Sequence, residues 1–192
     1  AMETELATIG EEPHSPISWS AIFAGAVTAV AVSLVFAGLA AGLGYKLAGP
    51  SPASGMSPSS FTPMLGAGMV LAQVLAFALG GYLAGRLRVK WVHVHTHEVF
   101  FRDTAHGLLA WALAAIFGAM LAASVFAAPA DPAIAGAPIP HQADIAAQIA
   151  YFSAFGLALG AFVSAVAAAL GGMRRDEMHQ LHRAGPRTGI SG

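Results

Sequence analysis

Four long stretches without a charged residue constrain this chain more than any other feature. They cover residues 17–44, 63–85, 104–127 and 145–172, and none contains Asp, Glu, Lys or Arg. A helix of about 20 apolar residues crosses a bilayer core about 30 Å thick, so each stretch is long enough to span it. In hydrocarbon the backbone must satisfy its own hydrogen bonds, and a helix does so. We therefore predict an all-α integral membrane four-helix bundle of two antiparallel transmembrane hairpins.

A soluble protein with four buried core helices is the alternative architecture. Soluble helices carry a polar face, whereas these stretches are apolar on every side, in a chain that is 56% hydrophobic and 10% charged. That composition favours the membrane protein. The acidic flank and the length of the first stretch also differ from a signal peptide, so we expect this stretch to remain as a span.

The bundle leaves little of the 192 residues for a second domain. We expect residues 1–192 to form a single membrane domain with mobile tails at 1–16 and 183–192. The polar sequence after residue 172 contains no helix breaker until Gly185-Pro186. The fourth helix is therefore expected to continue as far as His182.

Nearly all basic residues lie on one side of the predicted membrane. Eight of the nine Lys and Arg residues flank the loop at 86–103 or lie in the C-terminal tail, and only Lys46 lies on the other side. Basic residues near helix ends stay in the cytoplasm, so this loop and both termini are predicted to be cytoplasmic. The N-terminal tail is acidic, but acidic residues contribute little to this rule.

Pairs of small residues one helical turn apart recur in the stretches. Such pairs let two helix backbones approach closely, which drives helix association in membranes. Two interpretations stay open: the pairs close this bundle, or one or more of them faces another protein. The glycines concerned are Gly38, Gly42, Gly81, Gly85, Gly118, Gly156 and Gly160.

A histidine cluster in the loop between the second and third stretches is the most suggestive chemistry. His93, His95 and His97 alternate with other residues and are followed by Glu98. In a strand the three rings share one face, and in a helix His93 and His97 lie one turn apart. Either geometry suits zinc, nickel or copper. The simpler interpretation is an interfacial segment whose histidines tolerate both water and headgroups.

Four polar residues in or at the edge of the predicted spans are candidates for specific contacts. His106 is the only ionisable side chain within them, and its shallow position favours a structural hydrogen bond to a neighbouring carboxylate or carbonyl. Asp103 is expected at the start of the third helix, as a cap or first-turn acid. Gln73 and Gln148 should face protein and form interhelical hydrogen bonds.

Several function classes are disfavoured by the sequence. No Gly-x-Ser-x-Gly, His-Glu-x-x-His or phosphate-loop motif is present, so we expect no enzyme. The predicted spans contain no acidic residue, which argues against a proton-coupled transporter. A net charge of −1 argues against nucleic acid as a partner. Bound lipid is expected, and a transition metal is the one alternative cofactor.

Three segments resemble an uncharacterised bacterial family of membrane proteins often labelled "PhnA-like". They are Ser18–Gly25 (SWSAIFAG), Leu79–Arg86 (LGGYLAGR) and Arg102–Leu113 (RDTAHGLLAWAL), in the family's order. The loop with alternating histidines departs from the family, whose corresponding loops are shorter. The resemblance implies a multi-span protein of the bacterial inner membrane, and it implies no catalytic residues.

Two function classes remain. The first is a non-catalytic accessory subunit of a larger inner-membrane complex, respiratory or photosynthetic, whose partners are other membrane subunits and lipids. The second is a homo-oligomeric transporter or metal-responsive membrane protein that uses the histidine cluster. Small size, glycine-rich helices and short polar tails favour the first class. Only the second class requires the histidines.

Overall fold

The computed structural model of the protein consists of four long helices in its described residues, with no strand among them. The helices are α2 (Trp19–Leu47), α3 (Pro58–Leu87), α4 (Thr96–Phe126) and α6 (Gln142–Arg183). The described residues are 17–47, 58–88, 96–126 and 142–183. The tail predicted at 1–16 lies outside them, and so does the tail predicted at 183–192 except for Arg183, the last residue of α6.

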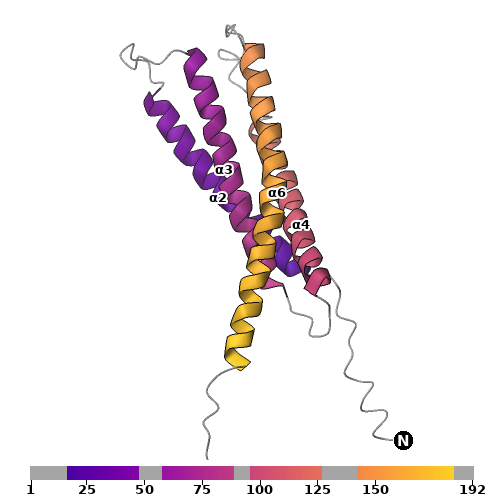
Figure 1. The fold of residues 1–192 in the computed structure, drawn as a ribbon. Helices are drawn as coiled ribbons and strands as arrows, with labels where there is room; N and C mark the ends of the chain where they lie inside the picture. The colour runs from indigo at the N-terminus through magenta and orange to yellow at the C-terminus, as the bar shows by residue number, and fades with distance from the viewer. Residues whose placement is uncertain (1–16, 48–57, 89–95, 127–141, 184–192) are drawn as a thin grey trace, which may run out of the picture.

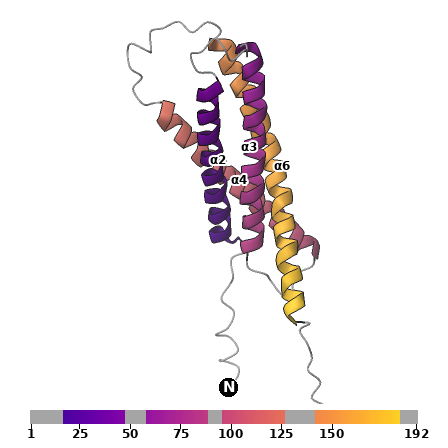
Figure 2. The same cartoon turned by 90° about the vertical axis from the view of Figure 1, so that its left-hand side faces the viewer.

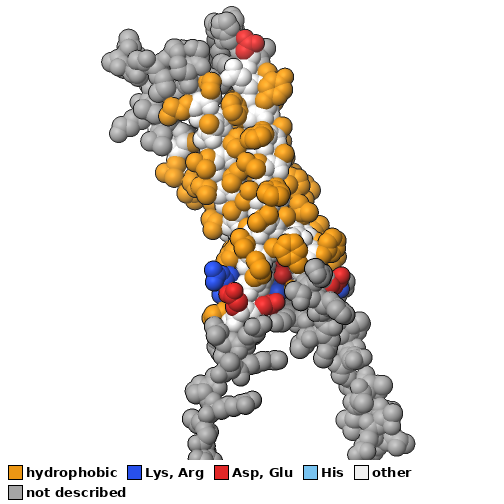
Figure 3. All heavy atoms as spheres, viewed as in Figure 1, with side chains coloured by type: hydrophobic (Ala, Val, Ile, Leu, Met, Phe, Trp, Pro, Cys, Tyr) orange, Lys and Arg blue, Asp and Glu red, His pale blue; other side chains and the backbone are white. Residues whose placement is uncertain are grey.

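Each helix contains a segment that is long and apolar enough to cross a membrane. These segments are Trp19–Ala40, Pro63–Leu87, Glu98–Ser124 and Ala146–Met178. Alanine and leucine, both strong helix formers, are common in all four. Apolar side chains cover the visible face, and acidic and basic side chains gather near its lower end (Figure 3). The predicted four-helix membrane architecture is confirmed at this level.

The helices alternate in direction and form a closed ring at one end. α3 packs against α2 and α6, and α4 packs against the same two helices, with a further α3–α4 contact across the ring. Successive helices run up and down, so α2–α3 and α4–α6 are antiparallel pairs (Figures 1 and 2). We call the end where α3 ends and α4 begins the charged end, and the opposite end the open end.

The buried core lies in the half of the bundle toward the charged end. One core cluster contains Ala26, Ala29, Phe77 and Ala114, and a second contains Ile22, Ala84 and Ala110. Most of these side chains are alanines, which let the helix axes come close. The core is therefore small and depends on backbone proximity more than on large side chains.

Toward the open end α2 and α4 lose contact with the rest of the bundle. Every side chain from Ile116 to Ser124 on α4 is exposed, and in residues 34–40 of α2 only Phe36 is partly covered. Figure 2 shows α4 diverging from α3 and α6 toward its C-terminal end. The four helices thus cover one another in one half. In the other half α3 and α6 stay in contact, since Gly66 lies against the Phe152 ring, and α2 and α4 are largely exposed.

One helix boundary differs from the sequence prediction in an informative way, and another agrees with it. α4 begins at Thr96 and not at residue 104, because the polar segment before the third apolar stretch is helical as well. α6 continues through its polar end to Arg183, as expected for a helix with no breaker before Gly185-Pro186. Both extensions place charged residues on helices at the charged end.

Candidate functional site

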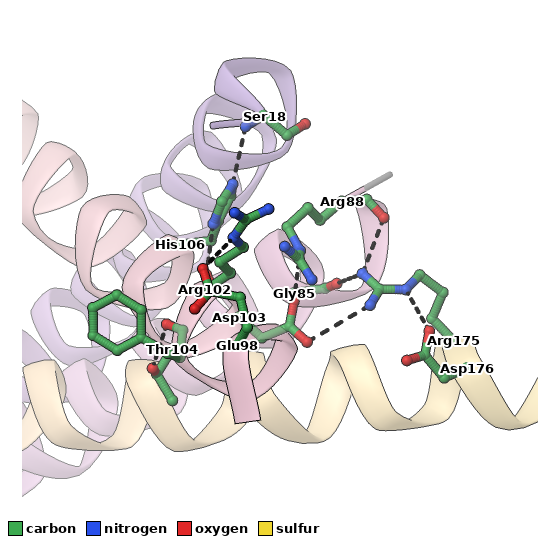
Figure 4. Close-up of polar contacts among 11 residues, drawn as sticks. Ser18, Gly85, Arg88, Glu98, Arg102, Asp103, Thr104, His106, Arg175 and Asp176 are labelled. Atoms are coloured by element: carbon green, nitrogen blue, oxygen red, sulfur yellow. Dashed lines mark hydrogen bonds and ion pairs between the residues drawn. The ribbon is translucent and has the colours of Figure 1, made fainter. Parts of the chain in front are cut away.

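Two arginines and one aspartate meet at the charged end. Arg88 directly follows α3, Asp103 lies on α4 and Arg175 on α6, and their side chains are 5%, 4% and 7% exposed. Arg88 Nε lies 2.7 Å from Asp103 Oδ1, and Arg175 Nη2 lies 3.6 Å from Asp103 Oδ2. Figure 4 shows the carboxylate between the two guanidinium groups. We call these three residues the arginine–aspartate cluster.

Arg175 also holds the end of α3 through the backbone. Its Nη1 donates hydrogen bonds to the carbonyl oxygens of Gly85, at 2.9 Å, and Arg88, at 3.0 Å. The last carbonyls of a helix have no partner within the helix, and a cation there also opposes the negative end of the helix dipole. A side chain of α6 therefore caps α3.

Glycine at position 172 makes room for the buried carboxylate. A Cβ atom at Gly172 would overlap Asp103 Oδ2. Gly171 next to it lies against the backbone of α3, where a Cβ would overlap the carbonyl oxygen of Tyr82. The Gly-Gly pair lets α6 approach both α3 and α4, which brings Arg175 within reach of its partners.

The charges of the arginine–aspartate cluster favour a structural role, in which opposite charges hold helix ends together. Burial lowers the pKa of Arg88, and the neighbouring carboxylate of Asp103 opposes that effect. An arginine stays protonated in either case, so Arg88 brings a full positive charge to this contact. Arg88 Nε and Asp103 Oδ1 form an ion pair at 2.7 Å. Arg175 Nε additionally donates to Asp176 Oδ1 at 3.1 Å.

A second group of polar contacts connects α4 with the start of α2. His106, 2% exposed, has Nδ1 at 2.7 Å from the carbonyl oxygen of Arg102. Its Nε2 accepts a hydrogen bond from the backbone amide of Ser18, at 2.9 Å. The Arg102 side chain pairs with Glu98 one turn earlier, at 2.9 Å. The expected hydrogen bond of His106 to a neighbouring carbonyl is present. The contact with the start of α2 was not expected from the sequence.

The predicted capping role of Asp103 is wrong. α4 begins at Thr96, so Asp103 lies in its second turn and not among the first amide groups of the helix. The carboxylate instead faces Arg88 and Arg175. Glu98 is the acidic residue of the first turn.

The histidine cluster is only partly within the described residues. His93 and His95 lie outside them, and the side chain of His97, whose backbone is in the first turn of α4, is not described. Glu98 is exposed and pairs with Arg102. Within the described ranges no group of three His, Asp or Glu side chains is placed to hold a metal ion. The metal hypothesis rests on the sequence alone.

The glycines of the predicted pairs fall into two groups. On α3, Gly81 and Gly85 lie against the backbone of α6, where added Cβ atoms would overlap the carbonyl oxygens of Ser164 and Ala168. On α6, Gly156 and Gly160 lie against side chains of α3, namely Gln73 and Phe77. By contrast, a Cβ built at Gly38, Gly42 or Gly118 meets nothing within 4 Å.

Other close contacts involve glycines outside the predicted pairs. A Cβ at Gly25 would lie 2.5 Å from the carbonyl oxygen of Gly80, so these two residues join α2 to α3. Gly107 lies against Ser164, whose hydroxyl donates a buried hydrogen bond of 2.8 Å to the Gly107 carbonyl. The signal available in the sequence was small-residue spacing, since Ala21 and Ala29 lie four residues from Gly25, and Ala76 and Ala84 four residues from Gly80.

We expected Gln73 and Gln148 to form interhelical hydrogen bonds, but their side-chain oxygens form none among the described residues. Within the described part of the chain, the Oε1 atoms of Gln73 and Gln148 are buried and have no hydrogen-bond partner. The indole N–H of Trp111 is also buried and has no hydrogen-bond partner among the described residues. Gln73 does face protein, because it lies against Gly156 of α6.

Comparison with known proteins adds no relative. No family model, curated protein or solved structure matches the chain. The assignment of function therefore depends on the geometry described above and on the resemblance noted from the sequence.

Proposed function

We propose that this protein is a non-catalytic accessory subunit of a larger complex in the bacterial inner membrane, whose activity, respiratory or photosynthetic, belongs to other subunits. In this proposal the charged end holds the four helices together at the cytoplasmic surface. The open end receives helices of the neighbouring subunits. The assignment to a bacterial membrane rests on the family resemblance. The cytoplasmic orientation of the charged end rests on the distribution of basic residues.

The observation that carries the proposal is that three glycines of the predicted pairs make no contact with another helix among the described residues. A Cβ built at Gly38 or Gly42 of α2, or at Gly118 of α4, meets nothing within 4 Å among the described residues, and all three positions are exposed. Small residues one turn apart on a membrane helix are typical of helix–helix contacts, since they expose the backbone to close approach. Among the described residues of the protomer they make no such contact. A helix from another subunit would use them.

The charged end supports a role in assembly over a role in chemistry. Asp103 is enclosed by two arginines, and both nitrogens of His106 are engaged by backbone groups. These side chains contact groups at the end of α3, on α4 and α6, and at the start of α2, so their contacts hold the helices together. Their arrangement supports a scaffold whose structure is fixed at one end.

The test is native mass spectrometry of the protein extracted in mild detergent from its own membranes, without overexpression. Co-migration with other subunits at a fixed stoichiometry is the expected result, and the activity of those subunits would name the process. A chain that migrates alone, or only with copies of itself, would contradict the proposal. A homo-oligomer that carries a transition metal would favour the transporter or metal-responsive alternative.

A matched pair of variants tests the proposed contact surface. Gly38→Leu places a large side chain where the protomer has open space, so the bundle should fold but lose its partners. Ala40→Leu adds a similar side chain at an exposed position of the same helix, about 200° around the helix axis. We expect co-migration to be lost with the first variant and kept with the second. Equal retention by both would exclude this surface.

A further inference from the structure

His106 is a buried titratable side chain whose two ring nitrogens are both engaged by backbone groups. Nδ1 lies 2.7 Å from the carbonyl oxygen of Arg102, four residues earlier on α4. Nε2 lies 2.9 Å from the backbone nitrogen of Ser18, the residue that precedes α2. Figure 4 shows the ring between these two groups.

These two contacts determine where the imidazole proton lies. A backbone amide can only donate, so Nε2 must be the unprotonated, accepting nitrogen. A backbone carbonyl can only accept, so Nδ1 must carry the proton. The structure therefore requires neutral His106 with its proton on Nδ1.

The contact with Ser18 supplies a helix cap from another helix. The carbonyl of Ser18 accepts the first hydrogen bond of α2, from the amide of Ile22 at 3.2 Å, which makes Ser18 the N-cap residue. Amide groups at the start of a helix have no partner within it. His106 of α4 provides a partner for one of them and so ties the beginning of α2 to the charged end.

We propose that His106 is a proton-sensitive clasp, in which a second proton on the imidazole detaches the start of α2 from α4. The added proton would occupy Nε2, the atom that accepts from Ser18, and would place two N–H groups against each other. The contact is thus complete while His106 is neutral and is lost as the pH falls. This inference goes beyond the proposed scaffold role, because it gives the charged end a response to acid.

The charged surroundings of His106 make an imidazolium a costly addition. Arg102 and Asp103 belong to its own helix, Arg88 comes from the end of α3, and Arg175 from α6. Residues 19–40 of α2 contain no charged side chain. A protonated His106 would therefore be a fourth cation in a region where each carboxylate already faces an arginine. Asp103 faces Arg88 and Arg175, and Glu98 pairs with Arg102. Asp176 pairs with Arg175. Detachment of α2 would open this crowded region to solvent.

Electron paramagnetic resonance of a label at the start of α2 tests the clasp. The chain contains no cysteine, so Ile17→Cys gives a single labelling site next to Ser18. In lipid nanodiscs we expect an immobilised spectrum at about pH 8 and a growing mobile component toward about pH 5. One proton can raise the ratio of detached to attached protein by up to about tenfold per pH unit. A spectrum that does not change with pH would overturn the proposal.

Matched variants isolate His106 from the other histidines. His106→Gln keeps an acceptor that does not titrate, so the label should stay immobilised at both pH values. His182→Gln makes the same change in the last turn of α6 and should leave the pH response intact. A label at Phe101→Cys, exposed on α4 at the same end, should not respond. A pH response that persists in His106→Gln would contradict the proposal.

The imidazole nitrogens give a direct second readout that requires no substitution at His106. In protein labelled with ¹⁵N-histidine, the His106 resonances at about pH 8 should identify a bare Nε2 and a protonated Nδ1. The opposite tautomer, or an imidazolium at this pH, would overturn the assignment on which the clasp depends.

Discussion

Asp103→Asn is the substitution that should damage the charged end most, because it removes one charge and keeps nearly the same shape. The carboxylate lies 2.7 Å from Arg88 Nε and 3.6 Å from Arg175 Nη2, and its side chain is only 4% exposed. After the change two buried guanidinium groups lose their common counter-ion. Arg175 keeps Asp176 and the carbonyls at the end of α3, so the loss falls mainly on Arg88.

The expected magnitude follows from the distances and the burial. With an effective dielectric constant of about 20, charges at these two separations attract by about 6 and about 5 kcal/mol. Desolvation of three buried ions cancels much of this attraction. Removing one member of a buried ion pair typically costs about 3–5 kcal/mol, because the remaining charge is left without a partner. We expect Asp103→Asn to lower the free energy of unfolding by an amount in that range.

The assay is unfolding by sodium dodecyl sulfate in mixed micelles, followed by circular dichroism. Glu177→Gln is the control, because its ion pair with Arg174 is exposed, at 62% and 69%, and should contribute less than about 1 kcal/mol. Adding Arg88→Gln to Asp103→Asn should recover part of the loss, since it removes the unpaired cation. Equal unfolding curves for Asp103→Asn and Glu177→Gln would refute the reasoning.

Two further predictions use the same unfolding assay. Gly85→Ala should destabilise the bundle by about 1–3 kcal/mol, because its Cβ would overlap the carbonyl oxygen of Ala168 on α6. Gly118→Ala has open space and should be neutral or stabilising by up to about 1 kcal/mol, so the same loss in both variants would contradict the assigned contacts. Gln73→Met should leave the isolated protein as stable or more stable, because it removes a buried oxygen without a partner. A clear loss of stability in that variant would show that Gln73 makes a hydrogen bond not seen here.

The membrane architecture could be predicted because it depends on local composition. Length and the absence of charge identify the four apolar stretches. The second and fourth lie within α3 and α6, and the first and third match α2 and α4 to within two residues at one end. The boundary at Thr96 was missed because the segment up to Asp103 is polar and helical at the same time. Absence of charge identifies the part of a helix that fits hydrocarbon, and it does not identify where the helix begins.

The arginine–aspartate cluster could not be predicted, because it depends on contacts between three helices. Arg88 and Arg175 were recognised only as basic residues at the ends of spans, and Asp103 as a residue at the start of one. Nothing local to these positions says that they converge. The available signal was Asp103, an acidic residue directly before the third apolar stretch and close in sequence to basic residues.

The glycine pairs illustrate the same difference between spacing and position. Gly38 and Gly42 have the same spacing as Gly81 and Gly85, yet only the second pair lies against another helix. Spacing predicts that two small residues share a helix face. Which face meets a neighbour depends on how all four helices pack.

The measurement that tests the central claim most directly is a pair of distances between spin labels on α2 and α4 in lipid nanodiscs. Cysteines at Phe23 and Leu109 report on the charged half, and cysteines at Leu34 and Met120, each eleven residues or about three turns further along, report on the open half. All four side chains are exposed, and the chain has no cysteine of its own. The account predicts a clearly longer distance for the second pair than for the first. Equal distances would mean that α2 and α4 stay together across the membrane, which would contradict the open end and the contact surface proposed for it.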